Sequence, residues 1–238
     1  MKLLISPKDE IEALEAILGG ADIIDVKNPA EGSLGANFPW VIRSIRDIVS
    51  VTKQEVSATI GDFINLPGTA SLAALGAACC EINYIKVGLK VSSEKNAGEI
   101  ANAVVRAVKE YDPKINVVIC GYADAKENNL MDCMKIPKIA SESGADIAML
   151  DTLTKNKNKN LFDHLAIEGI EKFTRDAHDL GLKVALGGSL KKEHIVPLYN
   201  AGVDIIGIRG AACELNDRTN AIKKERVKEL KDMINKQI

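Results

Sequence analysis

Short apolar segments alternate with longer amphipathic segments along the chain. The apolar segments are rich in Val, Ile and Leu, as buried parallel strands are. Eight of them occur, at Leu3–Ser6, Ile23–Lys27, Val56–Ile60, Tyr84–Gly88, Val117–Gly121, Ile147–Asp151, Val184–Gly188 and Ile205–Arg209. Apolar residues at helical spacing predict helices between them, for example at Glu10–Leu18, Pro39–Val49, Ala97–Val108, Phe162–Asp179 and Arg218–Ile234. The pattern therefore predicts eight strands, each followed by a helix.

The order of these segments favours one fold. The same cadence leads into three of the strands, as Gly20-Ala21-Asp22-Ile23, Gly144-Ala145-Asp146-Ile147 and Gly202-Val203-Asp204-Ile205. Eight units without an internal linker predict one domain of the α/β class over residues 1–238, a (β/α)8 TIM barrel. A doubly wound open sheet is the alternative, but Ser6-Pro7-Lys8-Asp9 follows the first strand where a glycine-rich dinucleotide loop would stand.

Composition narrows the classes of partner. The formal net charge of -2 provides no basic field for nucleic acid, so an anionic ligand must bind to a local cluster of charges. The five cysteines contain no C-x-x-C pair, which argues against a structural zinc site and fits reduced thiols in a cytoplasm. The apolar run at the N-terminus is too short for a signal peptide or a membrane span. We expect a cytoplasmic protein without a membrane partner.

The second predicted strand ends in two charged residues. Asp25 and Lys27 lie two positions apart, so their side chains share one face of the strand. A desolvated lysine titrates low enough to act as a nucleophile or a base, which makes Lys27 a candidate for covalent carbonyl chemistry. The alternative is a plain ion pair at the end of the strand.

More charged residues follow other strands, and the carboxyl ends of barrel strands converge on one pocket. Lys86 lies between apolar residues, where an unpartnered lysine is costly. Asp151 ends the sixth strand and Lys155 follows it, while Thr59, Asp62, Tyr122 and Asp124 lie at the ends of the third and fifth strands. Lysines and aspartates in one cavity predict imine chemistry with proton transfer. The lysines would compete with a metal ion for the carboxylates, so we predict neither a metal nor a cofactor.

Small residues follow the last two strands. Gly188 and Ser189 come after the seventh strand, and Arg209 and Gly210 come at the end of the eighth. This is the recurrent phosphate site of TIM barrels, where backbone N–H groups hold the anion. Arg209 would add a bidentate contact. We therefore predict a small phosphorylated substrate, although the glycines also fit tight turns alone.

Several long segments resemble one family, the (5-formylfuran-3-yl)methyl phosphate synthases, or 4-(hydroxymethyl)-2-furancarboxaldehyde-phosphate (4-HFC-P) synthases, of methanofuran biosynthesis. The resemblance covers essentially the whole chain. It rests on Ala21–Trp40, Ser71–Ala78, Tyr84–Leu89, Gly121–Ala125, Ala148–Thr152, Leu161–His164, Lys191–Ile195 and Gly207–Cys213. Local departures lie at Val91–Asn96 and in the Asn-Lys run after Lys155.

The resemblance implies a TIM-barrel lyase that joins two glyceraldehyde 3-phosphate molecules into a furan aldehyde carrying one phosphate. The imine-forming lysine of the family falls on Lys27 and its proton-transfer lysine on Lys86. Asp25, Asp151 and Lys155 match its other active-site charges. A class I aldolase acting on another sugar phosphate, or a barrel that only binds a phosphometabolite, would have similar features. A homo-oligomer is compatible with the sequence.

Overall fold

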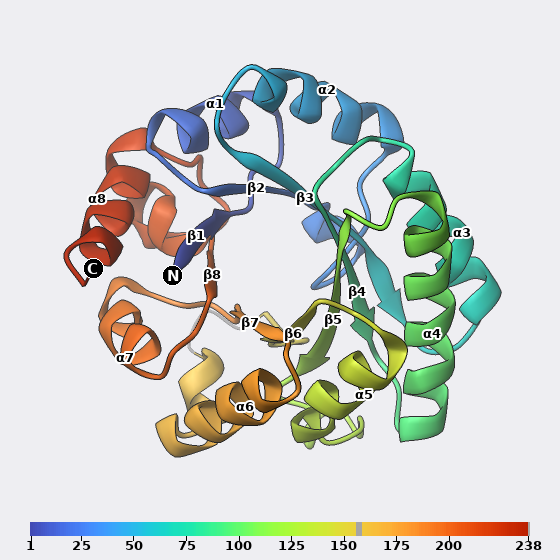
Figure 1. Ribbon diagram of the computed structural model, residues 1–238. Coiled ribbons are helices and arrows are strands. Elements are labelled where there is room, and N and C mark those ends of the chain that lie inside the picture. Colours follow the sequence, from blue (N-terminus) through green and yellow to red (C-terminus); the bar gives the residue numbers. More distant parts are fainter. Residues whose placement is uncertain (156–158, 238) are drawn as a thin grey trace.

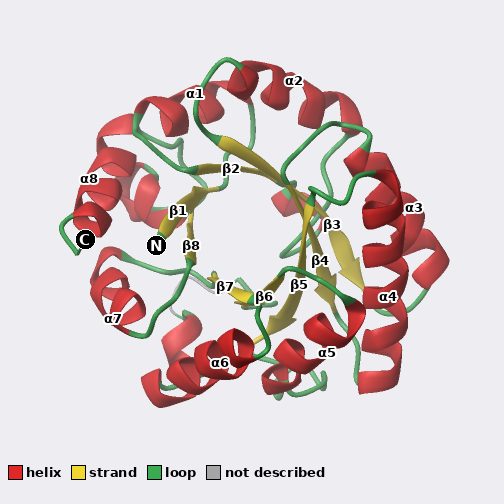
Figure 2. Ribbon diagram, in the orientation of Figure 1, coloured by secondary structure: helices red, strands yellow, loops and turns green. Residues whose placement is uncertain are grey.

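A computed structural model describes residues 1–155 and 159–237. Eight parallel strands form a closed barrel in chain order, and the helices surround it (Figures 1 and 2). The strands are β1 (Lys2–Ile5), β2 (Ile23–Val26), β3 (Glu55–Phe63), β4 (Tyr84–Leu89), β5 (Asn116–Tyr122), β6 (Ile147–Asp151), β7 (Lys183–Leu186) and β8 (Ile205–Ile208). The predicted (β/α)8 barrel is confirmed.

The helices of the outer layer mostly begin and end near the predicted residues. They are α1 (Glu10–Leu18), α2 (Pro39–Ser50), α3 (Pro67–Ala78), α4 (Glu94–Tyr111), α5 (Ile136–Ser143), α6 (Ile167–Asp179), α7 (Ile195–Asn200) and α8 (Lys224–Asn235). Within the described residues, no helix is long and apolar enough to cross a membrane.

Two helices begin later than predicted. Asn160 caps a separate 3-10 turn at Leu161–Asp163, so α6 starts only at Ile167. Residues 213–222 fold back on themselves, because Cys213 and Ile222 form an antiparallel bridge. The prediction of a helix from Arg218 is therefore wrong, and α8 begins at Lys224.

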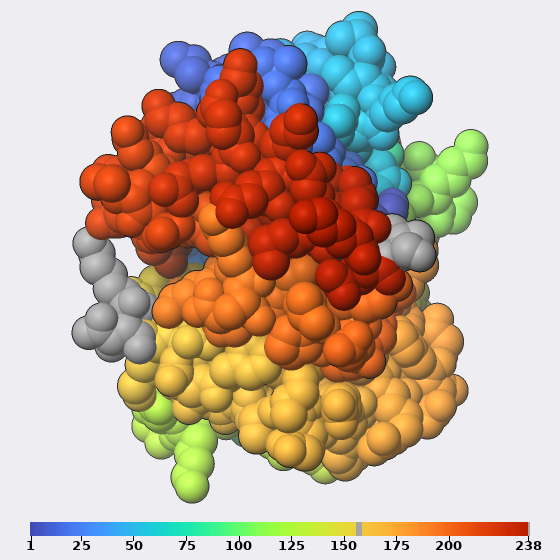
Figure 3. Space-filling model, turned by 90° about the vertical axis from the view of Figure 1, so that its left-hand side faces the viewer, coloured from blue at the N-terminus to red at the C-terminus, as the bar shows by residue number. Residues whose placement is uncertain are grey.

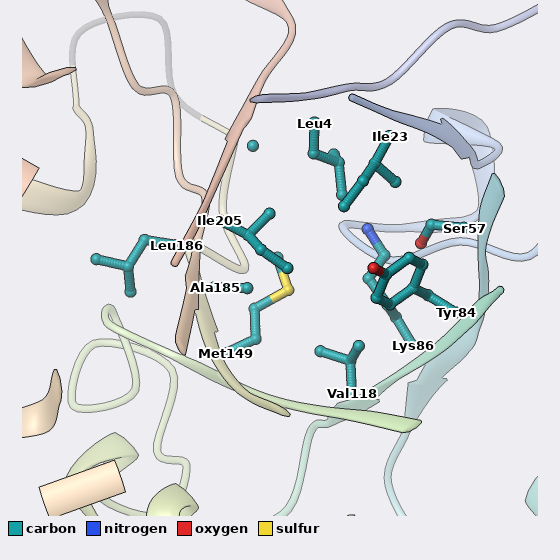
Figure 4. Close-up of a pocket in the computed structure, with 11 residues that line it drawn as sticks. Leu4, Ile23, Ser57, Tyr84, Lys86, Val118, Met149, Ala185, Leu186 and Ile205 are labelled. Carbon is teal, nitrogen blue, oxygen red and sulfur yellow. The ribbon is translucent and has the colours of Figure 1, made fainter. Parts of the chain in front are cut away.

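Apolar side chains fill two layers. One layer packs the outer face of the strands against the helices, and the other fills the interior of the barrel. Leu4, Ile23, Val118, Met149 and Ile205 converge in the interior from five strands, around a void of about 10 Å³ (Figure 4). Three residues with polar groups, Ser57, Tyr84 and Lys86, lie among them (Figure 4). The interior is therefore a packed floor beneath the carboxyl ends of the strands.

The aspartates of the repeated cadence have a common structural role. Each stands just before a strand, and one oxygen of its carboxylate accepts a hydrogen bond from a backbone N–H at the start of the preceding strand. The three pairs are Asp22 with Leu3 at 2.7 Å, Asp146 with Val117 at 2.7 Å and Asp204 with Val184 at 2.8 Å. These carboxylates satisfy backbone donors at the amino ends of the strands.

The barrel closes between the two ends of the chain. β1 pairs with β8 over four residues, and helix α1 packs against α8. The space-filling view shows the red C-terminal segment lying against the blue N-terminal segment on one face (Figure 3). The two ends of the sequence therefore complete the same wall of the barrel.

Candidate active site

A cavity of about 540 Å³ opens at the carboxyl ends of the strands. Nine of the residues that the sequence predicted for the site lie on its wall, namely Asp25, Lys27, Lys86, Asp151, Lys155, Gly188, Ser189, Arg209 and Gly210. They come from β2, β4 and β6 and from the loops after β2, β6, β7 and β8. The barrel topology thus brings residues from distant parts of the sequence to one space.

Lys27 is the buried, unpaired amine of this cavity. Only 9% of the residue is exposed, and within the described residues its amine forms no hydrogen bond or ion pair. The ion pair between Asp25 and Lys27 that the sequence left open is not formed. Burial lowers the pKa of Lys27 to about 8, and the nearby Asp151 carboxylate opposes that shift. A substantial fraction of this amine is therefore neutral near physiological pH.

Asp25 instead pairs with Lys86. Lys86 Nζ lies 2.6 Å from Asp25 Oδ1, and both side chains are almost entirely buried. Ser6 Oγ donates a hydrogen bond of 2.9 Å to the other carboxylate oxygen of Asp25. Lys86 thus has the partner that a lysine inside an apolar strand requires.

Asp151 and Lys155 form the second ion pair of the cavity. Asp151 Oδ1 also accepts a 2.7 Å hydrogen bond from the backbone N–H of Thr152. Burial acts to raise the pKa of Asp151, but the charges of Lys155 and Lys27 hold it below its ordinary value. Asp151 is therefore a carboxylate at neutral pH. The Asn-Lys run after Lys155, where the sequence departs from the family, includes residues 156–158, which lie outside the described residues.

The turn after β7 lies on the cavity wall. Gly188 has a φ of +97° and Ser189 a φ of +54°, so the chain turns sharply here. Leu161 N–H donates to the carbonyl oxygen of Gly188 at 2.9 Å, which fixes the turn. The N–H groups of Gly188 and Ser189 donate no hydrogen bond to any group in residues 1–155 and 159–237. Unpaired N–H groups on a cavity wall favour an anion.

Arg209 does not have the role predicted for it. Nη1 and Nη2 of its guanidinium bind the Glu12 carboxylate at 2.7 and 3.3 Å. Nη1 also donates to the Ser6 carbonyl at 2.6 Å, and Nε donates to the Arg218 carbonyl at 2.9 Å. These bonds use four of the five N–H donors of an arginine. A bidentate phosphate contact by Arg209 is therefore corrected to a structural role in joining α1, β1 and β8.

Arg218 lines the cavity, although the sequence analysis did not place it there. It was predicted to begin the last helix, but it lies in the loop before α8. Burial lowers the pKa of its guanidinium, and the charge of Asp151 opposes that shift. The Asp217-Arg218-Thr219 sequence, typical of a turn that an aspartate side chain closes, was the available signal.

Four strand-end residues from the sequence analysis do not line the cavity. Asp62 accepts hydrogen bonds from the N–H groups of Ser33 and Leu34 and from the Tyr122 hydroxyl. Thr59 Oγ1 donates to the Gly35 carbonyl at 2.6 Å. These contacts fix the loop after β2, immediately beyond Lys27.

Asp124 fixes the loop after β6 in a similar way. Its carboxylate accepts hydrogen bonds from the N–H groups of Leu153 and Thr154, at 2.7 and 2.8 Å. Lys155 follows directly, so Asp124 positions the backbone that carries it. Among the residues that the structure describes, no group of three or more His, Cys, Asp and Glu side chains could hold a metal ion.

Known proteins resemble this chain over nearly its full length. A family model described as 4-HFC-P synthase matches residues 3–231. The chain belongs to the 4-HFC-P synthase family. It is 54% identical over 237 residues to the (5-formylfuran-3-yl)methyl phosphate synthase of Methanocaldococcus jannaschii, covering 98% of this chain and 99% of that protein. It is 53% identical over 235 residues to the synthase of the same name from Methanobrevibacter smithii, covering 98% of each.

Solved structures agree on the fold of this 4-HFC-P synthase family member. A 3-hexulose-6-phosphate synthase superposes with a TM-score of 0.68 at 17% identity, covering 98% of this chain and 100% of that chain. Thiamine phosphate pyrophosphorylase from Pyrococcus furiosus gives 0.65 at 14% identity, covering 99% and 96%. At such low identities the likeness concerns the barrel, whereas family membership makes the chain an enzyme of the synthase class.

The contact between Glu12 and Arg209 provides a test of stability. Although burial acts to raise it, the hydrogen bonds from Arg209 hold the pKa of Glu12 below its usual value. Glu12→Gln leaves the Arg209 charge without its buried partner, so we expect the free energy of unfolding to fall by about 3 kcal/mol. Urea denaturation measures this change. The control is Glu110→Gln, whose ion pair with Arg106 is exposed and is expected to contribute under about 1 kcal/mol. Equal losses in the two variants would contradict the structural role of Arg209.

Proposed function

We propose that this enzyme condenses two molecules of glyceraldehyde 3-phosphate into (5-formylfuran-3-yl)methyl phosphate through an imine on Lys27. The names of the relatives support the product. The observation that carries the mechanism is the unpaired, buried Lys27 amine with a pKa of about 8, flanked by two lysine–aspartate pairs. The reaction belongs to methanofuran biosynthesis and requires no metal or cofactor.

The balance of the reaction defines what the site must do. Two triose phosphates give one furan phosphate, one inorganic phosphate and two waters. The enzyme therefore forms a carbon–carbon bond, eliminates phosphate and removes water. Each step moves a proton to or from a carbon or an oxygen close to a carbonyl group. An imine at the carbonyl carbon makes the protons on the adjacent carbon more acidic.

Lys27 begins the reaction in this proposal. Its neutral amine adds to the aldehyde carbon of a triose phosphate, and the hydroxyl that forms leaves as water, giving an iminium. Loss of the proton from the adjacent carbon gives an enamine, and the electron pair then expels phosphate from the next carbon. This β-elimination needs no oxidant or reductant. Lys27 is regenerated when water hydrolyses the final imine.

The two ion pairs supply the protons. Lys86 donates a proton to a departing oxygen and takes one from carbon. Asp25, which accepts a hydrogen bond from Ser6, holds the Lys86 amine in place. Asp151 is the carboxylate whose charge acts most strongly on Lys27, and its ion pair with Lys155 balances that charge when Lys27 is neutral. Gly188, Ser189 and Gly210 are the backbone contacts of a substrate phosphate.

Three measurements test the proposal. Incubation with glyceraldehyde 3-phosphate alone should give a product with the mass of the furan phosphate and release one inorganic phosphate per product. Borohydride should reduce the intermediate and attach a triose-derived group to Lys27, seen by peptide mass analysis. An aldolase would form the imine without releasing phosphate, and a binding protein would not be labelled. Either result would reject the proposal.

The pH dependence of labelling should follow the titration of Lys27. Because only the neutral amine attacks, we expect the initial labelling rate to rise about tenfold per pH unit below about pH 8 and to level off above it. Asp151 raises the pKa of Lys27 and Lys155 lowers it. Asp151→Asn should therefore move the bend in the profile to lower pH, and Lys155→Gln should move it to higher pH. Shifts in the same direction would mean that these charges do not control the Lys27 amine.

A further inference from the structure

We propose that Arg218 binds the phosphate group of the aldehyde that reacts at Lys27, and that Arg209 positions Arg218 for this task. The inference rests on the proposed function and names a substrate-binding residue of the same site. It replaces the direct contact that the sequence predicted for Arg209.

The ion pairs around the cavity single out Arg218. Seven cationic side chains line the cavity, and five of them are paired, namely Lys86 with Asp25, Lys155 with Asp151, Lys191 with Glu193, Lys192 with Glu229 and Arg209 with Glu12. Within the described residues, no carboxylate forms an ion pair with either of the other two, Lys27 and Arg218. One unpaired cation is the reacting amine. The other is a free charge for an anionic substrate.

The environment of Arg218 suits an incoming anion. Its guanidinium is half-buried, and burial lowers its pKa, so the charged form gains from a partner that enters the cavity. The neighbouring Asp217 has other partners, since its Oδ1 accepts hydrogen bonds from the N–H and the hydroxyl of Thr219 at 3.0 and 2.8 Å. A planar guanidinium offers paired N–H donors, which match the oxygens of a phosphate monoester.

A hydrogen bond also holds the backbone of Arg218. Its carbonyl oxygen accepts a 2.9 Å hydrogen bond from Arg209 Nε, and the other end of the Arg209 fork is fixed to Glu12 on α1. The bridge between Cys213 and Ile222 closes the base of the same loop. The Arg218 backbone is therefore anchored at the end of β8 and, through Arg209, to α1, so the segment that carries the side chain is ordered before a ligand binds.

The turn after the neighbouring strand β7 completes the phosphate site. Gly188 and Ser189 line the same cavity, and their N–H groups are unpaired within the described residues. Arg218 would contribute the charge and these amides the remaining hydrogen bonds. The ligand class is a phosphate monoester of a short aldehyde, with its carbonyl carbon at Lys27.

Borohydride labelling of Lys27 with two aldehydes tests the assignment. Glyceraldehyde 3-phosphate carries the phosphate, whereas glyceraldehyde has the same carbonyl and no phosphate. In Arg218→Gln we expect the concentration of glyceraldehyde 3-phosphate for half-maximal labelling to rise about 10- to 100-fold, as for the loss of a hydrogen bond to a charged group. Labelling by glyceraldehyde should change less than about twofold. Arg218→Lys should fall between, because it keeps the charge but loses the fork.

The matched control is Arg175→Gln, at an exposed position of α6, which should label as the unaltered enzyme does. An equal loss with both aldehydes in Arg218→Gln, or no loss with the phosphorylated one, would overturn the assignment. Calorimetry with inorganic phosphate gives an answer even if no imine forms. Loss of phosphate binding in Arg218→Gln supports the phosphate site. If the unaltered protein binds phosphate in this way but is not labelled by borohydride, only the imine mechanism is rejected. Binding that persists in Arg218→Gln, or is absent from the unaltered protein, rejects the phosphate site itself.

Discussion

Lys27→Arg should reduce turnover by about four orders of magnitude or more, the scale seen when an enzyme loses its nucleophile. Arginine keeps the positive charge, but its guanidinium stays protonated and forms no imine. The cavity of about 540 Å³ has room for the larger side chain, so the fold should persist. Steady-state release of inorganic phosphate from glyceraldehyde 3-phosphate measures the loss, and borohydride should leave the variant unlabelled.

The control for this variant makes the same chemical change elsewhere. Lys172→Arg alters an exposed residue of α6 that pairs with Asp176, and it should keep full turnover. Circular dichroism and thermal unfolding should be alike for the two variants and the unaltered enzyme. Residual turnover of more than about one per cent in Lys27→Arg would remove the imine from the mechanism.

Lys86→Ala should lower turnover by about 10²- to 10⁴-fold, the usual contribution of a general acid or base, while Lys27 is still labelled by borohydride. The geometry adds a second effect. Asp25 is 0% exposed and loses its ion-pair partner, so we expect the free energy of unfolding to fall by about 3–5 kcal/mol. Phosphate release, labelling and urea denaturation measure the three quantities.

A double variant separates these two effects. Lys86→Met with Asp25→Asn removes both charges and keeps similar volumes, so it should recover most of the lost stability. Turnover should remain as low as in Lys86→Ala. Recovery of turnover together with stability would show that the pair is structural. Loss of labelling in a folded Lys86→Ala would show that the roles of Lys27 and Lys86 are not separate.

The sequence predicted the fold well because each strand and helix is encoded locally. Apolar runs, helical spacing and glycines after helices all act over a few residues, and the barrel follows from their order. The same reasoning placed Asp25, Lys27, Lys86 and Asp151 at one mouth, since carboxyl ends of barrel strands meet there. These positions required no knowledge of any contact.

Contacts between distant residues were the part that the sequence did not reveal. Asp25 has two candidate partners, Lys27 two positions away and Lys86 61 positions away in the sequence. In the structure it forms an ion pair with the more distant one, Lys86. Arg209 is 197 positions from Glu12, and no local pattern indicates that its fork is already occupied. Arg218 was assigned to a helix because it begins a segment of helical spacing that runs to Ile234. Its neighbours Asp217 and Thr219 are poor helix formers, and the bridge of Cys213 with Ile222 keeps them out of the helix.

The closure of the barrel between β1 and β8 bears on how the chain is made. During synthesis Lys27 emerges early, whereas β8 and the Arg209 contact to Glu12 form only after nearly all of the chain has left the ribosome. Until then Lys27 is an ordinary solvated lysine, with a pKa near 10.4, and is almost wholly protonated at neutral pH. A nascent or unfolded chain is therefore poorly reactive toward the aldehydes around it, and the nucleophile becomes available only together with the cavity that directs it.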